Sequence, residues 1–196
     1  MSAIQAMDRS YASLRQMLRE GIFPPGHRLE ANRLADDLGV SMTPVRDVLH
    51  RLVGEGLVEA SSGEGFHVPR LTETALRDLY EWNAALLTIV ARTARPDPAE
   101  EAAPPLWEMP AGADRVAALF ARIAAAAPNR EIGHAIATAS DRLHPFRIIE
   151  PKVLEQIEGE FDELVIRGPG QAQMIRRYHL RRMRAVPDLL RERDAG

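Results

Sequence analysis

The sequence predicts a mainly α-helical protein, in which an N-terminal winged helix-turn-helix with a small β-hairpin wing is followed by an all-helical bundle. Two observations support this fold class. Residues 1–70 show three helical patterns and then two short strand patterns, whereas only helical patterns follow residue 70. A chain of 196 residues is long enough for two domains, which we place at residues 1–70 and 71–196.

The composition excludes several classes of protein. Hydrophobic residues make up 45% of the chain and charged residues 27%, as in ordinary globular proteins. Cysteine is absent, which excludes disulfides, thiolate zinc sites and cysteine nucleophiles. The sequence contains no apolar run of about 18 residues and no secretory signal pattern, so we expect a cytoplasmic protein with no membrane partner.

Two helices separated by a rigid turn are expected at the start of the chain. The second should span residues 31–38, with two leucines on one face, and should end at Gly39. The turn is the Phe-Pro-Pro-Gly sequence at 23–26, where proline fixes the backbone and removes donors. The first helix should run from about residue 3 to 20, because apolar residues recur every three or four positions, at Ile4, Met7, Tyr11, Leu14 and Leu18.

A third helix should begin at Ser41 or Thr43, either of which can cap it, because Pro44 is tolerated only in a first helical turn. Strand patterns at 57–60 and 66–68 are joined by a turn rich in serine and glycine, which predicts the hairpin. The helical period divides the third helix into a buried stripe of Val45, Val48, Leu49, Leu52 and Val53 and a free face of Met42, Thr43, Arg46, Asp47 and His50.

The second domain is expected to contain helices only. Thr72 should cap its first helix, which runs to about residue 94 with Leu76, Leu79, Leu86 and Val90 facing inward. Residues 95–112 hold five prolines and are expected to be irregular. Further helices are predicted at about 114–127, 129–143, 151–167 and 171–185, separated by Pro128, Pro145 and a Gly-Pro-Gly sequence at 168–170.

Three motifs lie in the predicted helix-turn-helix. Pro24-Pro25-Gly26 precedes the second helix, Leu38-Gly39-Val40-Ser41 joins the second and third helices, and Thr43-Pro44-Val45-Arg46 opens the third. At these separations the motifs closely resemble the GntR family of bacterial regulators over residues 8–70. The resemblance implies that the third helix enters the major groove of double-stranded DNA and that a homodimer binds inverted-repeat operators.

Charge alone does not predict a nucleic-acid-binding protein. The net charge is −3, and residues 1–70 carry eight arginines against nine acidic residues. Phosphate contacts need positive charge and backbone amides on one face only, rather than a basic domain. The prediction of DNA binding therefore depends on the motifs.

The resemblance implies DNA contacts from the start of the second helix, the first turns of the third helix and the wing. Arg46 is the leading candidate, because a guanidinium at the front of a recognition helix can bind guanine O6 and N7 or a phosphate; outside the motif it would be interpreted as a solvated surface arginine. Methionine replaces an arginine frequent in relatives at position 42, so we expect a different operator preference. The corresponding positions are Asn32, Arg33, Ser41, Met42, Thr43, Arg46, Gly63, Gly65 and His67.

Residues 72–94 resemble the opening helix of the all-helical, FCD-type C-terminal domain in the FadR-like branch of the family. Many members hold a divalent metal there on one aspartate and three histidines. Here Val116 and Phe120 occupy the places of the aspartate and the first histidine, and only His179 matches a ligand. We therefore expect no metal and no other cofactor, with His134, Asp141 and His144 as remote alternative ligands.

The same resemblance suggests an effector pocket of changed polarity. Asn83 stands where relatives often have an effector-binding arginine, and Leu87 replaces a frequent acidic residue. Both changes make the pocket less polar, which favours a neutral or bulkier small-molecule effector, or none. The candidate lining residues are Asn83, Arg142, Arg147, Arg176, Tyr178 and His179.

The sequence thus predicts a dimeric transcription regulator, acting as a repressor, with a possible small-molecule effector. The alternative is a protein-interaction module that keeps the fold without reading DNA specifically, which the acidic balance and Met42 favour. An enzyme is not expected, because no nucleophile with a base partner, phosphate-binding loop or paired-carboxylate arrangement is found.

Overall fold

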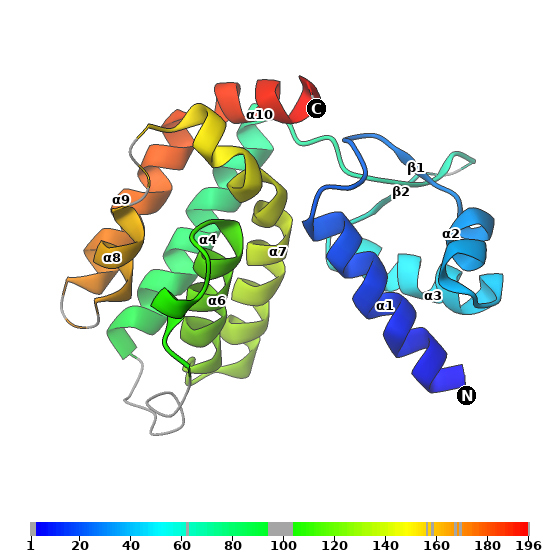
Figure 1. Ribbon diagram of the computed structural model, residues 1–196, viewed down its shortest axis with the longest axis horizontal. Helices are drawn as coiled ribbons and strands as arrows, with labels where there is room; N and C mark the ends of the chain where they lie inside the picture. The colour runs from blue at the N-terminus through cyan, green and yellow to red at the C-terminus, as the bar shows by residue number, and fades with distance from the viewer. Residues whose placement is uncertain are drawn as a thin grey trace. The chain divides into compact units, whose positions relative to one another are not determined.

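The structure is a computed structural model, which describes residues 3–61, 63–93, 104–155, 157, 159–166, 168 and 170–195. The chain divides into two compact units, with the boundary between Arg70 and Leu71. Figure 1 shows the N-terminal unit as helices with a small sheet and the C-terminal unit as helices only. The predicted fold class is therefore confirmed.

The N-terminal unit is built around one amphipathic helix, α3. Its buried side chains include Val45 and Leu49, both 0% exposed, and they pack against Leu14 of α1 and Leu34 of α2. The helix is therefore held between its two predecessors by hydrophobic burial. The elements of this unit are α1 (Ala3–Arg19), β1 (Arg28–Leu29), α2 (Ala31–Leu38), α3 (Met42–Gly54), β2 (Glu59–Ser61) and β3 (Gly65–His67).

The sheet contains the predicted hairpin and one strand that the sequence did not predict. Its strand order is β1-β3-β2 and both pairings are antiparallel. Strand β1 has only two residues, of which Leu29 is buried and Arg28 is exposed. Two residues cannot show an alternating pattern, so β1 is defined by its pairing with Phe66 and His67 rather than by local sequence.

In the C-terminal unit α4 contacts α6, α7, α9 and α10. Thr72 caps α4 as predicted, because its hydroxyl accepts a hydrogen bond from the backbone N–H of Ala75 at 3.2 Å. The unit consists of α4 (Glu73–Thr93), a 3₁₀ turn η1 (Leu106–Glu108), α6 (Ala113–Ala125), α7 (Arg130–Val153), α8 (Glu160–Val165), α9 (Gln171–Arg184) and α10 (Val186–Ala195).

The prediction of a helix break at Pro145 was wrong, since α7 continues through Pro145 and Pro151 to Val153. A proline inside a helix costs about 3 kcal/mol. Burying one large apolar side chain recovers about 1.5–3 kcal/mol, and α7 buries Leu143 and Phe146 on either side of Pro145. Tertiary packing therefore outweighs the local helix-breaking signal.

Two other predicted segments differ from the structure. The helix predicted at 151–167 is replaced by the end of α7 and the short α8; the second difference is α10, a helix that the sequence analysis did not predict. Helix α10 is held by burial of Val186 and Leu189 against α4 and α7, which its own polar sequence does not reveal. Of the predicted irregular segment at 95–112, residues 95–103 lie outside the described residues.

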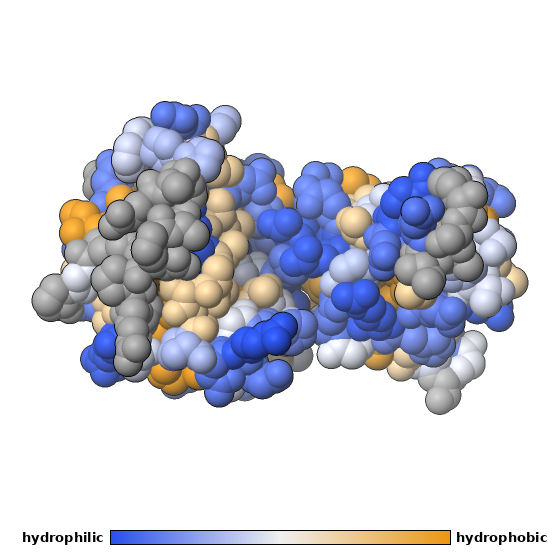
Figure 2. All heavy atoms as spheres, turned by 90° about the horizontal axis from the view of Figure 1, so that it is seen from below, coloured by the Kyte–Doolittle hydropathy of each residue, from blue (hydrophilic) through white to orange (hydrophobic). Residues whose placement is uncertain are grey.

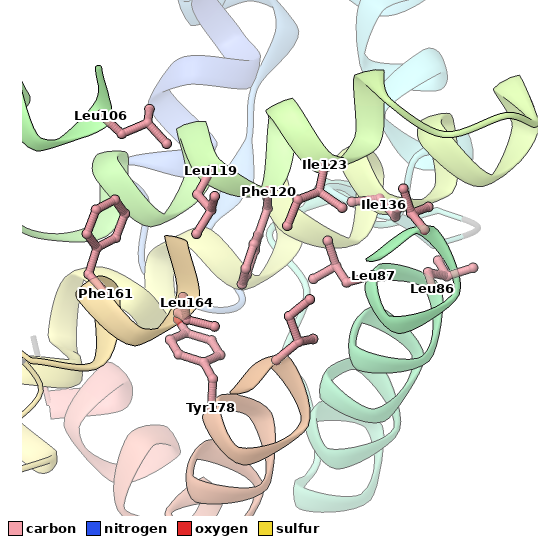
Figure 3. Close-up of a cluster of buried hydrophobic side chains, with 12 residues drawn as sticks. Leu86, Leu87, Leu106, Leu119, Phe120, Ile123, Ile136, Phe161, Leu164 and Tyr178 are labelled. Atoms are coloured by element: carbon pink, nitrogen blue, oxygen red, sulfur yellow. The ribbon is translucent and has the colours of Figure 1, made fainter. Parts of the chain in front are cut away.

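The C-terminal unit contains two hydrophobic clusters. Figure 3 shows one of them, with Phe120 of α6 pointing toward Tyr178 of α9 between Leu87 and Leu164. On the surface seen in Figure 2, hydrophilic residues predominate, and a band of weakly hydrophobic residues crosses the C-terminal unit. Among the helices in the described ranges, none has the length and apolar character needed to span a bilayer.

Replacing Gly39 by alanine is expected to destabilise the N-terminal unit by about 1 kcal/mol. Gly39 has φ 64°, a left-handed conformation that a Cβ atom disfavours, although a Cβ there would contact nothing within 4 Å. Gly54→Ala is the matched control: Gly54 lies in α3 with equally open space, so the change should stabilise the helix by up to about 1 kcal/mol. Hydrogen exchange of the α3 amides measures both effects, and equal effects of the two substitutions would contradict the prediction.

Candidate nucleic-acid interface and C-terminal cavity

Helix α3 exposes one continuous face at its N-terminal end. The side chains of Ser41, Met42, Thr43 and Arg46 are all exposed, whereas the side of the helix that faces α1 and α2 is buried in the core. Ser41 is the N-cap residue, and its side chain makes no capping hydrogen bond, so its hydroxyl points to no backbone amide of the helix. The backbone N–H groups of the first turn and the positive end of the helix dipole lie at the same place, which suits a phosphate.

The turn between α2 and α3 fixes where this face begins. Gly39 adopts the left-handed conformation, and the backbone N–H of Val40 donates to the carbonyl of Ala35 at 3.0 Å. Val40 also packs against the hydrophobic core of the unit. The closing residues of α2 are thus bonded to the turn, and the turn places Ser41 at the start of α3.

The two predicted contact residues on α2, Asn32 and Arg33, are exposed in its first turn. Arg33 pairs with Glu30, with 2.9 Å between Nε and Oε2 and a side chain that is 78% exposed. An exposed ion pair of this kind contributes at most about 1 kcal/mol. Arg33 can therefore exchange this partner for a phosphate at little cost.

The wing brings the remaining predicted residues to the tip of the hairpin. Gly63 and Gly65 are exposed and have φ angles of 83° and 88°. His67 is half-buried on β3 and pairs with Arg28 on one side and Glu59 on the other. The wing is tied to α3, because the rings of His50 and Phe66 pack edge to face with centroids 4.9 Å apart.

Arg28 is a candidate contact residue that sequence reasoning missed. It is exposed on β1, and its Nε lies 3.9 Å from the position that a Cβ on Gly65 would occupy. A guanidinium therefore lies along the wing, where it adds local positive charge to a unit that has more acidic than basic residues. Only the register of β1 against β3 shows this, because no strand pattern marks Arg28 in the sequence.

The two arginines of α3 have different roles. Arg51 is committed to the structure: its guanidinium carbon lies 3.6 Å from the ring centroid of Tyr11, and its Nε is 3.2 Å from Oε1 of Glu55. The Tyr11 hydroxyl also donates to Glu55, at 2.9 Å, which joins α1 to α3. Within the described part of the chain, Arg46 makes no ion pair or hydrogen bond, so its guanidinium is available to a ligand.

The C-terminal unit contains a partly open cavity of about 260 Å³, lined by residues of α6, α7, α8 and α9. Two of the predicted pocket residues, Arg147 and Tyr178, line this cavity. Arg176 is instead exposed on α9, and Arg142 is half-buried on α7. The other lining side chains include apolar Val116, Ile157, Phe161 and Leu164 and charged Glu150, Glu160 and Arg182.

The remaining two predicted pocket residues, Asn83 and His179, contact each other in the interior. Nδ1 of His179 is 2.7 Å from the carbonyl oxygen of Ile175, and Nε2 is 2.9 Å from the Asn83 carboxamide. The pKa of His179 is lowered to about 3, mainly by burial; the Ile175 hydrogen bond opposes this effect, and the guanidinium groups of Arg147 and Arg182 add to it. The imidazole is therefore neutral, with Nδ1–H donating to Ile175.

The histidines and the buried aspartate do not assemble a metal site. Both nitrogens of His179 have partners, and Phe120 stacks on its ring at 5.6 Å, in the place where the resemblance would require a histidine. His144 lies with its Nε2 3.4 Å from Asp114 Oδ1, and His134 is exposed on α7. Within the described ranges no three potential ligands converge. Two nearby guanidinium groups also oppose a cation, so these residues do not fit a divalent metal.

The N-terminal unit matches known regulators in sequence. Residues 7–68 match the family model of bacterial regulatory proteins of the gntR family. The chain is 40% identical over 72 residues to the Nta operon transcriptional regulator of Aminobacter aminovorans, covering 37% of this chain and 34% of that protein. It is 34% identical over 71 residues to the HTH-type transcriptional regulator YdhC of Bacillus subtilis, covering 36% and 32%. The matches thus span about a third of these relatives, which are transcription regulators rather than enzymes.

The likeness in fold extends over both units. A crystal structure of a GntR transcriptional regulator from Rhodococcus sp. covers 93% of this chain and 97% of its own, with a TM-score of 0.68 at 15% sequence identity. At this identity the comparison shows the fold alone. The Rhodococcus protein therefore shares the order of an N-terminal helix-turn-helix unit followed by a helical unit.

Acid should destabilise the protein through His179. The folded protein keeps this imidazole neutral down to about pH 3, whereas the unfolded chain takes up a proton below its ordinary pKa of 6.5. Stability is therefore complete above pH 6.5 and falls by about 1.4 kcal/mol per pH unit from this group as the pH drops toward 3. Urea unfolding across this range should show a smaller acid loss in His179→Leu, whereas exposed His134→Leu should retain the full loss. Equal acid losses in both variants would contradict the prediction.

Proposed function

We propose that the chain is a GntR-family transcription regulator that binds operator DNA through α3 and the wing, because residues 7–68 match the gntR family model. One observation carries the proposal: Arg46 lies exposed and uncommitted on the first turns of a helix whose opposite face is core. A helix held in this way can enter a major groove about 12 Å wide without rearranging the unit.

Each exposed group on the interface suits a different part of DNA. The guanidinium of Arg46 forks onto guanine O6 and N7, and the apolar side chain of Met42, 41% exposed, suits a thymine methyl group. The hydroxyls of Ser41 and Thr43 suit phosphate oxygens beside the N-terminus of α3. Arg28 along the wing supplies a further cation for the backbone or the minor groove.

We propose that the regulator acts as a homodimer on inverted-repeat operators, since one recognition helix supplies little discrimination. The C-terminal unit offers a surface for this contact. Helix α4 carries Trp82 and Ile89, exposed by 53% and 45%, with Ala85 between them on the same exposed face. Apolar residues spaced by about one and two helical turns are suited to pack against a second copy.

The C-terminal unit is proposed to be an FCD-type domain of the FadR-like branch, working in the cytoplasm. The likeness in fold to the Rhodococcus regulator supports a helical domain of this kind. The cavity in this unit supports a small-molecule effector, and release of DNA on effector binding would make the protein a repressor. The alternative, an interaction module without specific DNA binding, is favoured by Met42 and the acidic residues of the first unit.

Arg46→Ala should weaken operator binding roughly 5- to 150-fold, because it removes one base or phosphate contact worth about 1–3 kcal/mol. Mobility shifts of the full chain on its own upstream DNA measure this, with unrelated DNA as competitor. Arg191→Ala is the matched control: it removes the same charge from an exposed arginine on α10 and should leave binding unchanged. Equal, weak binding of all three proteins to every sequence would favour the interaction module instead.

Ile89→Glu should shift the protein from dimer to monomer, because a carboxylate in an apolar interface loses its hydration without gaining a partner. Sedimentation equilibrium measures the change in mass. Ile166→Glu provides the control, since Ile166 is 66% exposed but follows α8 rather than lying on α4. A dimer that persists in Ile89→Glu would rule out the α4 face as the interface.

A further inference from the structure

One methionine is exposed on the surface that is proposed to contact DNA. Met42 is the first residue of α3 and is 41% exposed. It belongs to none of the three hydrophobic clusters of the two units. Ser41, Thr43 and Arg46 are exposed at the same end of the helix. The thioether of Met42 is therefore accessible to small molecules in water, at a place that bound DNA would cover.

The other methionines in the described ranges are shielded by packing. Met7 and Met17 on α1 are partly buried against the hydrophobic core of the N-terminal unit. Met109 and Met174 are partly buried against one cluster of the C-terminal unit, and Met183 against the other. Exposure therefore distinguishes one thioether from the other five that the structure describes.

The side chain of Met42 can be oxidised without help from another group of the protein. The chain has no cysteine, so its thioethers are the sulfur groups that an oxidant meets. With hydrogen peroxide, a lone pair of the sulfur attacks one oxygen and the O–O bond breaks. The transferred oxygen stays on the sulfur as a sulfoxide, and its proton passes to the leaving hydroxide, which becomes water. The sulfur loses two electrons and the peroxide gains them, so the oxidant is the only co-reactant.

A sulfoxide is poorly suited to the DNA contact proposed for Met42. The thioether side chain is apolar, which suits the methyl group of thymine. A sulfoxide is polar, and its oxygen accepts hydrogen bonds but cannot donate one. The polar atom that thymine presents in the major groove, O4, is also an acceptor. The sulfoxide oxygen would therefore lose water without gaining a donor from that base.

We propose that Met42 is an oxidation-sensing site, where peroxide forms the sulfoxide in preference to the packed methionines and thereby weakens operator binding. Methionine sulfoxide reductases regenerate the thioether, which makes the change reversible. The fold of the unit is kept, because the side chains that hold α3, such as Val45 and Leu49, lie on its buried face. The effect on DNA rests on the proposed function, whereas the preferential oxidation does not.

Limited treatment of the full-length protein with hydrogen peroxide tests the site. Tandem mass spectrometry of a protease digest assigns an added oxygen to one residue, and the tryptic peptide 34–46 contains Met42 as its only methionine. Met42 should gain oxygen before the five packed methionines do. In urea, where packing is lost, all six should react at similar rates. Equal rates in the folded protein, or earlier oxidation of a packed methionine, would overturn the proposal.

Mobility shifts on the upstream DNA connect oxidation to operator binding. Peroxide-treated protein should bind roughly fivefold more weakly or worse, and reductases that act on both sulfoxide epimers should restore the affinity. Met42→Leu keeps an apolar side chain of similar volume without sulfur, so peroxide should not change its affinity, whatever its starting value. Met109→Leu is the matched control: it removes a packed thioether from the C-terminal unit and should keep the full response to peroxide.

The two measurements separate this inference from the proposed function. A peroxide response that persists in Met42→Leu, or oxidation of Met42 that leaves operator affinity unchanged, counts against the inference alone. Failure of the untreated protein to bind operator DNA counts against the proposed function. The site itself then still stands or falls on the order in which the methionines are oxidised.

Discussion

The burial of one face of α3 is the constraint on which the rest of the N-terminal unit depends. Val45 and Leu49 are completely buried, and successive side chains on a helix are about 100° apart. This leaves Thr43 and Arg46 on the outer face. Turning the helix to hide Arg46 would expose Val48, which is now 1% exposed, and bury an unpaired guanidinium, which the hydrophobic effect and charge desolvation both oppose. The interface is therefore oriented by the core before any DNA is bound.

The same constraint explains how a unit with more acidic than basic residues can present a surface suited to DNA. Of the two arginines on α3, Arg51 is held by Tyr11 and Glu55 and contributes to packing, whereas Arg46 is left for a ligand. Strand β1 then adds Arg28 beside the wing. What matters for phosphate contact is the charge on this one face, and net charge averages it with carboxylates placed elsewhere.

The parts of the fold that the sequence predicted are those with local causes. Helix α2 has the predicted bounds, because a leucine pair and Gly39 define it within eight residues. The predicted break at Pro145 was wrong, because α7 is held through this position by packing against α4, α6 and α10. Strand β1 was missed because it is defined by pairing with β3. Both features depend on residues far along the chain. In the candidate interface, Arg46 could be named from its motif, whereas Arg28 required the strand register.

The cavity in the C-terminal unit also depends on residues that are far apart in the sequence, so its charge pairing could not be predicted from any one of them. Arg147 could be named as a pocket candidate, but the sequence does not show that Glu150 on α7 and Glu160 on α8 converge on Arg182 of α9. Glu160 also pairs with Arg181, with 2.6 Å between its Oε1 and Nη1 of Arg181, and Ser140 accepts two hydrogen bonds from Nη1 of Arg147. A guanidinium fixed in this way loses little side-chain freedom when a ligand binds, whereas exposed Arg46 must be ordered by DNA. The two arginines therefore differ in how far the fold has already ordered them: Arg147 is fixed by its bonds to Ser140, whereas Arg46 is exposed.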